Sequence, residues 1–254
     1  MAKLFIGTSG WAYGHWMGLF YPKNLPPKDK LKYYSQYFKT VEINYSFYHL
    51  PQPSVYQKWY QETPLGFIFA VKVSRFITHI KRLKGVKFAC KSFFENSLCL
   101  KQKLGPILFQ FPASFKANEK NIERLENFLK LISVNQRLDQ RKSAVLRFAF
   151  EFRCQSWCDE KIYKLLKKYN TAWVIADSLR YPKAEVVTAD FIYIRMHGPG
   201  ALFSSKYTNK QLKILTQKIK TWLKKHLDVY VYFNNDAKGF AVENARVLKG
   251  LLKD

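Results

Sequence analysis

Eight short apolar runs are the feature that most constrains the fold of this chain. They are rich in Val, Ile, Phe and Tyr, and most of them are continuous rather than alternating. Continuous runs of this length are typical of strands that are buried on both faces, as in a parallel sheet. The runs cover residues 4–7, 40–43, 67–73, 107–111, 145–152, 172–176, 191–196 and 229–233.

Segments with apolar residues at helical spacing lie between these runs. The clearest covers residues 209–227, where Leu212 and Ile219 belong to an apolar face and lysines lie opposite. Thr208 and Gln211 have the spacing of a capping box at its start. The other helical segments cover residues 54–62, 88–104, 121–132 and 160–169.

The alternation of strands and helices predicts a (β/α)8 barrel formed as a single domain over residues 1–254. Residues 178–190, after the sixth run, are too few for a full helix with its loops. A doubly wound open sheet is the alternative. Its usual G-x-G-x-x-G signature is absent, because the first run leads into GTSGWAYG.

Every apolar run ends in polar or ionisable residues. Side chains two positions apart on a strand share a face, and active sites of such barrels lie at the carboxyl ends of the strands. We therefore expect the polar strand ends to meet in the barrel mouth. The pairs that share a face are Glu42 with Asn44, Glu151 with Arg153, and Arg195 with His197.

The charge of the chain favours anionic partners. Lysine and arginine number 43 against 18 acidic residues, which gives a net charge of +25. Nucleic acid, phosphorylated metabolites and acidic membrane surfaces all fit such a balance. A general preference for lysine in the source genome is the other interpretation of this composition.

Four cysteines occur, Cys90, Cys99, Cys154 and Cys158, and their spacing matches neither a zinc ribbon nor a disulfide framework. We interpret them as reduced thiols of a cytoplasmic protein. The amino-terminal residues do not have the pattern of a signal peptide. No run approaches 18 apolar residues, so we expect no membrane span.

The motifs along the chain resemble those of a known family. They are GTSGWAYGHWMGLFYP, TVEINYSFY, FAVKVSRFITH, LGPILFQFP, FEFRCQSW, YIRMHG and YFNND followed by a later Asn-Ala. Together, and in this order, they are similar to the YecE-like family, domain of unknown function 72, from residue 6 to about residue 248. The resemblance implies a TIM-type barrel and no particular activity. One departure is Tyr45-Ser46, where Ser-Thr is more usual in the family.

The strand ends and motifs give two sets of candidate residues. The candidates for acid–base chemistry are Glu42, Lys72, Glu151, Asp177 and His197. The candidates for substrate binding are Trp11, Tyr13, Asn44, Tyr48, His79, Gln110, Arg153, Trp157, Arg195, Asn234 and Asn235. In the second set the arginines suit anionic oxygens and the aromatic rings suit bases or sugars.

Three functions fit these residues. The first is a hydrolase, such as a phosphodiesterase, acting on a phosphorylated or nucleic-acid substrate at the mouth. The second is an isomerase, epimerase or lyase of a sugar or small acid, which moves a proton next to a carbonyl with paired carboxylates and a Lys or His. The third is a nucleic-acid or phosphate-binding module without catalysis. We expect Glu151→Gln or Arg195→Ala to abolish turnover or ligand binding and to leave the thermal midpoint nearly unchanged.

The sequence indicates no organic cofactor. A single divalent cation, Mg²⁺ or Mn²⁺, could be held by Glu42, Glu151 or Asp177. Cations interleaved with these carboxylates would compete with the metal for them. Substrate, reaction and oligomeric state do not follow from the sequence.

Overall fold

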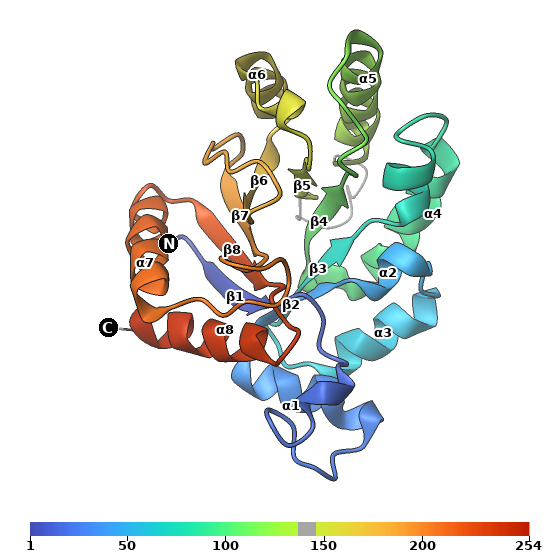
Figure 1. Ribbon diagram of the computed structural model, residues 1–254. Coiled ribbons are helices and arrows are strands. Elements are labelled where there is room, and N and C mark those ends of the chain that lie inside the picture. The colour runs from blue at the N-terminus through green and yellow to red at the C-terminus, as the bar shows by residue number, and fades with distance from the viewer. Residues whose placement is uncertain (137–145, 254) are drawn as a thin grey trace.

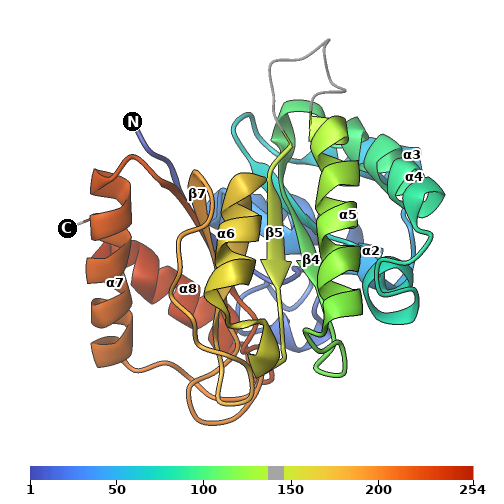
Figure 2. The same cartoon turned by 90° about the horizontal axis from the view of Figure 1, so that it is seen from above.

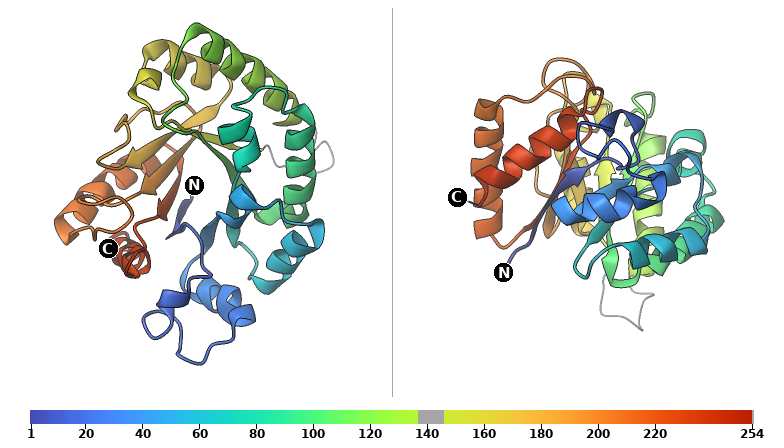
Figure 3. Two further views of the ribbon diagram at one scale, coloured as in Figure 1. Left: turned by 45° about the vertical axis from the view of Figure 1, so that its right-hand side comes forward. Right: turned by 90° about the horizontal axis from the view of Figure 1, so that it is seen from below.

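The apolar runs form parallel strands that surround a common axis (Figure 1; Figure 3). The computed structural model describes residues 1–136 and 146–253. In these residues the eight strands have the order β1-β8-β7-β6-β5-β4-β3-β2. The strands are β1 (Leu4–Thr8), β2 (Thr40–Ile43), β3 (Ile68–Lys72), β4 (Leu104–Gln110), β5 (Phe148–Glu151), β6 (Thr171–Asp177), β7 (Phe191–Met196) and β8 (Asp228–Phe233). The prediction of a (β/α)8 barrel is confirmed.

Helices surround the strands on the outside, as Figure 2 and Figure 3 show. They are α1 (Lys30–Tyr37), α2 (Tyr45–Tyr48), α3 (Pro53–Glu62), α4 (Lys87–Ser97), α5 (Glu119–Gln136), α6 (Glu160–Lys168), α7 (Asn209–Lys224) and α8 (Phe240–Leu251). Short 3-10 or π-helical turns cover Gly14–Trp16 (η1), Pro27–Asp29 (η2), Phe76–Ile80 (η3), Leu98–Lys103 (η4) and Gln155–Trp157 (η5). Residues 178–190 contain no helix, as expected. None of the helices in the described part of the chain is long and apolar enough to cross a membrane.

The predicted helix over residues 88–104 is wrong at its end. The α-helix stops at Ser97, a 3-10 segment follows with Lys101 at φ +51°, and β4 already begins at Leu104. Strand β4 begins earlier than predicted, and its residue Gly105 lies against β3. A Cβ atom at Gly105 would come within 2.4 Å of the Ile68 side chain. Only a glycine allows this close approach of the two strands.

The sequence patterns did not locate three helices, namely α1, α2 and α8. The predicted fifth strand began at Val145, which lies outside the described residues. The capping box of α7 is confirmed, because Thr208 and Gln211 satisfy each other's backbone N–H groups.

The seam between β1 and β2 is closed by a side chain rather than by a full ladder of backbone hydrogen bonds. In the described residues the two strands share one bridge, between Ser9 and Glu42. The buried Tyr34 hydroxyl of α1 spans the rest of the seam. It accepts from the Thr8 backbone N–H at 3.0 Å and donates to the Thr40 carbonyl at 3.1 Å. A helix side chain therefore completes the barrel where the backbones do not pair.

Strand parity separates an inner core from an outer one. The inner core contains Phe5, Ala70, Leu108, Ala149 and Tyr193, which fill the barrel axis. The outer core lies between the strands and the helices. Because side chains alternate, the next inward positions toward the carboxyl ends are those of the predicted polar residues.

Candidate functional site

A cavity of about 700 Å³ opens at the carboxyl ends of the strands. Residues at or after every strand except β6 line it. Its volume lies within the range of small-molecule sites. The lining residues are Tyr13, His15, Asn44, Phe47, Tyr48, Lys72, Arg75, His79, Gln110, Arg153, Arg195, Phe203, Asn234, Asp236 and Ala237.

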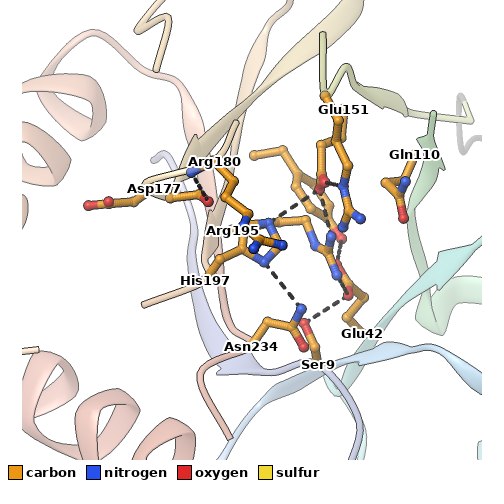
Figure 4. A network of polar contacts seen from close by, with 12 residues as sticks. Ser9, Glu42, Gln110, Glu151, Asp177, Arg180, Arg195, His197 and Asn234 are labelled. Atoms are coloured by element: carbon orange, nitrogen blue, oxygen red, sulfur yellow. Dashed lines mark hydrogen bonds and ion pairs between the residues drawn. The ribbon is translucent and has the colours of Figure 1, made fainter. Parts of the chain in front are cut away.

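Arg195 joins two glutamates at the floor of this cavity (Figure 4). Its Nε and Nη2 atoms donate to the two carboxylate oxygens of Glu42 at 3.0 and 2.7 Å. Its Nη1 atom donates to Glu151 at 2.6 Å. All three side chains are buried, with exposures of 0–1%. The alternation of side chains along the strands predicted that these three residues face inward, and the structure brings them together.

Every oxygen of Glu42 already has partners. Besides Arg195, it accepts from the Ser9 hydroxyl at 2.8 Å and from the Tyr193 hydroxyl at 2.7 Å. Burial alone would raise the pKa of Glu42, but Arg195 and these hydrogen bonds outweigh it and hold the pKa below its usual value. Glu42 is therefore a fixed carboxylate that positions Arg195 rather than a group that exchanges protons.

Glu151 is likewise held in the ionised state. Its Oε1 atom accepts from Arg153 at 2.9 Å, and His197 Nε2 lies 3.6 Å from its Oε2 atom. Burial opposes ionisation, yet Arg195 and Arg153 keep the pKa of Glu151 well below its usual value. His197 is fully buried, and burial lowers its pKa, so the ring is neutral near pH 7.

Arg153 presents a free edge to the cavity. Its Nε atom is bonded to Glu151, and its guanidinium lies 4.2 Å from the ring centre of Tyr181. Within the described residues, nothing accepts a hydrogen bond from its Nη atoms. A guanidinium in this state can bind an anionic oxygen with two parallel N–H groups.

Lys72 is a cation of the cavity that has no carboxylate partner among the described residues. Its side chain is largely buried, and its Nζ atom lies 3.9 Å from the ring centre of Phe47. Burial, and then the charges of Arg195 and Arg153, lower its pKa to about 7. At neutral pH a large fraction of Lys72 is therefore an uncharged amine that faces an open cavity.

His79 and Gln110 form the wall next to Lys72. The Gln110 amide nitrogen lies 3.4 Å from His79 Nε2, and the Thr78 hydroxyl lies 2.9 Å from His79 Nδ1. Burial and the charge of Lys72 lower the pKa of His79 to about 4. Asn44 lines the same cavity, and its buried Oδ1 atom has no partner among the described residues. These groups are neutral donors and acceptors for a ligand.

Four predicted residues lie elsewhere, and Asp177 is the clearest correction. It pairs in register with Met196, which faces the outer core, so its carboxylate also points outward. Figure 4 shows it directed away from the glutamates. Its Oδ1 atom lies 3.2 Å from Lys183 Nζ. The strand end of β6 is polar because the chain emerges there, not because it faces the cavity.

The other three are held by packing. Trp157 is fully buried, stacks on Phe152 at 4.6 Å and donates to the Phe115 carbonyl. Trp11 packs edge-on against Trp59 and does not line the cavity.

Asn235 is also buried, and it donates to the Ser205 carbonyl and to the Asn244 side chain. It therefore joins the loop after β7 to α8. Aromatic and amide residues next to strand ends can be structural, and sequence alone does not separate the two roles.

Sequence reasoning missed a pair on the opposite wall. His15 Nε2 lies 2.9 Å from Asp236 Oδ2, and the Trp16 indole N–H donates to the same carboxylate. Burial raises the pKa of Asp236 to about 6. Asp236 stands in the YFNND motif, and His15 precedes a buried tryptophan. Strand parity could not indicate this pair, because His15 lies in the 3-10 turn η1 and Asp236 in a loop.

The side chains at the floor of the cavity do not favour the binding of a metal ion. Among residues 1–136 and 146–253, no three His, Cys, Asp or Glu side chains come together as metal ligands. Glu42 and Glu151 already accept from guanidinium groups, and Asp177 points away.

The fold and site define a TIM-type barrel protein with a cation-rich cavity at its carboxyl-terminal mouth. The model of the family described as "Protein of unknown function DUF72" matches residues 5–254, and the chain belongs to this family. The resemblance noted from the motifs is thus confirmed.

Relatives and solved structures agree with this assignment. UPF0759 protein YunF of Bacillus subtilis is 28% identical over 98% of this chain and 94% of its own length. UPF0759 protein YecE of Escherichia coli K12 is 28% identical over 46% of this chain and 40% of its own length. A DUF72 family protein from Thermotoga maritima has a TM-score of 0.85 at 30% identity, covering 99% of this chain and all of that one. These comparisons indicate no activity or substrate.

Proposed function

We propose that this protein is a phosphoester hydrolase that binds its substrate in the mouth cavity. The observation that carries the proposal is the pair Lys72 and Arg153. Both face one cavity, and no described carboxylate neutralises Lys72 or the Nη edge of Arg153. Together with Arg195, these two cations outnumber Glu42 and Glu151 when Lys72 is protonated, so the site favours an anion.

The charges of the floor support this assignment. Arg195 and Arg153 donate to Glu42 and Glu151, which reduces the repulsion between these carboxylates and a bound anion. Arg75 adds a further cation to the lining. A phosphoryl group placed between Lys72 and Arg153 would receive two charged donors, and the same donors would stabilise charge on its equatorial oxygens in the transition state.

The exposed rim favours a substrate that carries an aromatic base. The Tyr48 side chain lines the cavity and is 65% exposed. An exposed ring beside a phosphate site can stack on a nucleobase. We therefore place nucleotides and single-stranded nucleic-acid ends first among the substrates.

The test of the binding step uses calorimetry with inorganic phosphate. Wild type should bind it, and Lys72→Met should weaken binding by about tenfold or more, because a charged hydrogen bond contributes about 1.5–3 kcal/mol. Lys84→Met is the matched control, since Lys84 is exposed and does not line the cavity. Equal binding by wild type and Lys72→Met would contradict the proposed site.

The test of the reaction uses 4-nitrophenyl phosphate and bis(4-nitrophenyl) phosphate. Release of nitrophenol by wild type, lost in Lys72→Met and kept in Lys84→Met, is the expected result. Binding that depends strongly on salt, without turnover of either ester, would favour the non-catalytic module instead.

A lyase or isomerase remains the second candidate because of the state of Lys72. A desolvated amine with a pKa near 7 can take a proton next to a carbonyl or form an imine with it. Borohydride trapping of a phosphorylated aldehyde on Lys72 would favour this candidate over the hydrolase.

We also place the protein in a reducing compartment such as the cytoplasm. All four cysteines, Cys90, Cys99, Cys154 and Cys158, are free thiols in the structure, which supports this placement.

A further inference from the structure

His15 and Asp236 lie on the wall of the cavity that faces the phosphate site proposed above. His15 follows β1 and Asp236 follows β8, which are neighbouring strands. Arg153 follows β5, which is four strands from β1 in the order β1-β8-β7-β6-β5 and therefore lies across the barrel. Because all three residues line one cavity, a bound phosphoryl group would lie between them.

The hydrogen bonds of His15 fix its tautomer. Its Nε2 atom lies 2.9 Å from Asp236 Oδ2 and 2.8 Å from the Asp236 carbonyl oxygen. Both partners are acceptors when the carboxylate is ionised, so Nε2 carries the proton. In the neutral ring Nδ1 is then the free acceptor, and no described residue donates to it.

Asp236 is itself held in place. The fully buried Trp16 donates its indole N–H to both carboxylate oxygens, at 2.9 and 3.0 Å. The carboxylate is buried with an exposure of 8% for the residue, whereas the His15 side chain is 42% exposed. A fixed acid thus orients an imidazole that can reach a ligand, which is the arrangement of the base and its orienting acid in hydrolytic triads.

We propose that His15 is the general base of the hydrolysis and that Asp236 is its positioning residue. This inference rests on the proposed function. His15 Nδ1 takes a proton from a water molecule while the water oxygen forms a bond to phosphorus. The bond from phosphorus to the leaving oxygen breaks with its electron pair. The protonated His15 then gives its proton to the leaving oxygen or to solvent, which restores the neutral ring.

The first test is chemical rescue with bis(4-nitrophenyl) phosphate as the probe. His15→Ala should lower kcat by about 100-fold or more, the contribution typical of a general base. Free imidazole should restore part of this loss, since the exposed side chain leaves a space that solvent reaches. His49→Ala is the matched control, because His49 is exposed and does not line the cavity. Full activity of His15→Ala, or a loss that imidazole does not relieve, overturns the proposal.

The second test reads the tautomer directly. Side-chain ¹⁵N spectra of wild type should show the His15 proton on Nε2. In Asp236→Asn the carbonyl of residue 236 still accepts from Nε2, so the proton should stay there. The ring loses the carboxylate that holds it and stabilises its protonated form, so kcat should fall while phosphate binding is kept. A wild-type proton on Nδ1 overturns the proposal even if Asp236→Asn does not fold.

The two proposals fail in different ways. If wild type hydrolyses neither ester, the hydrolase assignment fails and the role of His15 fails with it. If wild type hydrolyses an ester and His15→Ala does so at the same rate, only the role of His15 is overturned.

Discussion

At the scale of single residues, the site is a set of charges whose states differ because their surroundings differ. Glu42 is surrounded by donors and stays ionised, whereas Lys72 is buried beside other cations and loses its proton near pH 7. Both are buried ionisable groups at strand ends. What separates them is whether an opposite charge lies within hydrogen-bonding distance.

Anion binding should therefore be coupled to protonation of Lys72. Its pKa in the free protein is lowered to about 7, so at pH 8 most of the amine is neutral. A bound anion favours the charged form and raises this pKa, and up to one proton should be taken up per anion. Calorimetry with sulfate in buffers of different ionisation enthalpy measures this uptake. The same uptake in Lys72→Met would show that another group is responsible.

The buried glutamates should matter for stability more than for proton transfer. Glu42→Gln leaves Arg195 without one of its two charge partners at an exposure of 1%. Breaking a buried ion pair typically destabilises by about 3–5 kcal/mol, and we expect a loss in this range in the free energy of unfolding measured with urea. Glu126→Gln is the control, because Glu126 forms a partly exposed pair with Lys130 and its change should have little effect. An unchanged stability of Glu42→Gln would mean that the floor tolerates a neutral side chain.

The burial of Arg195 and Glu151 changes the expected effect of Arg195→Ala and Glu151→Gln on stability. Both were expected to leave the thermal midpoint nearly unchanged. The structure buries both side chains and pairs them at 2.6 Å. Arg195→Ala therefore leaves Glu42 without its guanidinium partner, and Glu151→Gln leaves Arg195 with one carboxylate instead of two. We now expect the midpoint to fall, and a loss of activity in these variants would not by itself identify a catalytic role.

At the scale of elements, the barrel depends on a contact between helix α1 and the β1–β2 seam. Tyr34→Phe removes the hydroxyl that accepts from the Thr8 N–H and donates to the Thr40 carbonyl. Leaving buried backbone groups unpaired costs about 1–3 kcal/mol, which urea unfolding would detect. In the control Tyr33→Phe, the lost hydroxyl contacts the Tyr37 hydroxyl, so a smaller effect is expected. Equal effects would show that the seam does not need Tyr34.

The register of neighbouring strands decides which side chains reach the cavity. Gln110 pairs with Glu151, and both point inward. Asp177 pairs with Met196 and points outward. One position along a strand thus moves a carboxylate from the cavity to the outer surface. Register follows from the whole sheet, so the polar end of β6 alone did not reveal it.

At the scale of the whole molecule, the net charge of +25 and the local charge of the cavity are separate quantities. Surface lysines such as those of α7 lie outside the barrel, whereas Lys72 and Arg153 act inside the mouth. Salt screens exposed charges more than buried ones. A ligand held by the cavity cations should therefore keep more of its affinity in salt than one held by the surface.

The sequence by itself determined the order of strands, the barrel and the inward face of Glu42, Glu151 and Arg195. Each follows from a period of two residues or from a run of apolar residues, and both are local properties. Only the tertiary structure decided which charges meet. Arg195 contacts Glu42 across 153 positions of the chain, and His15 contacts Asp236 across 221. Electrostatic interactions depend on distance and burial in space, so the ionised floor, the lowered pKa of Lys72 and the oriented His15 appear only once the chain is folded.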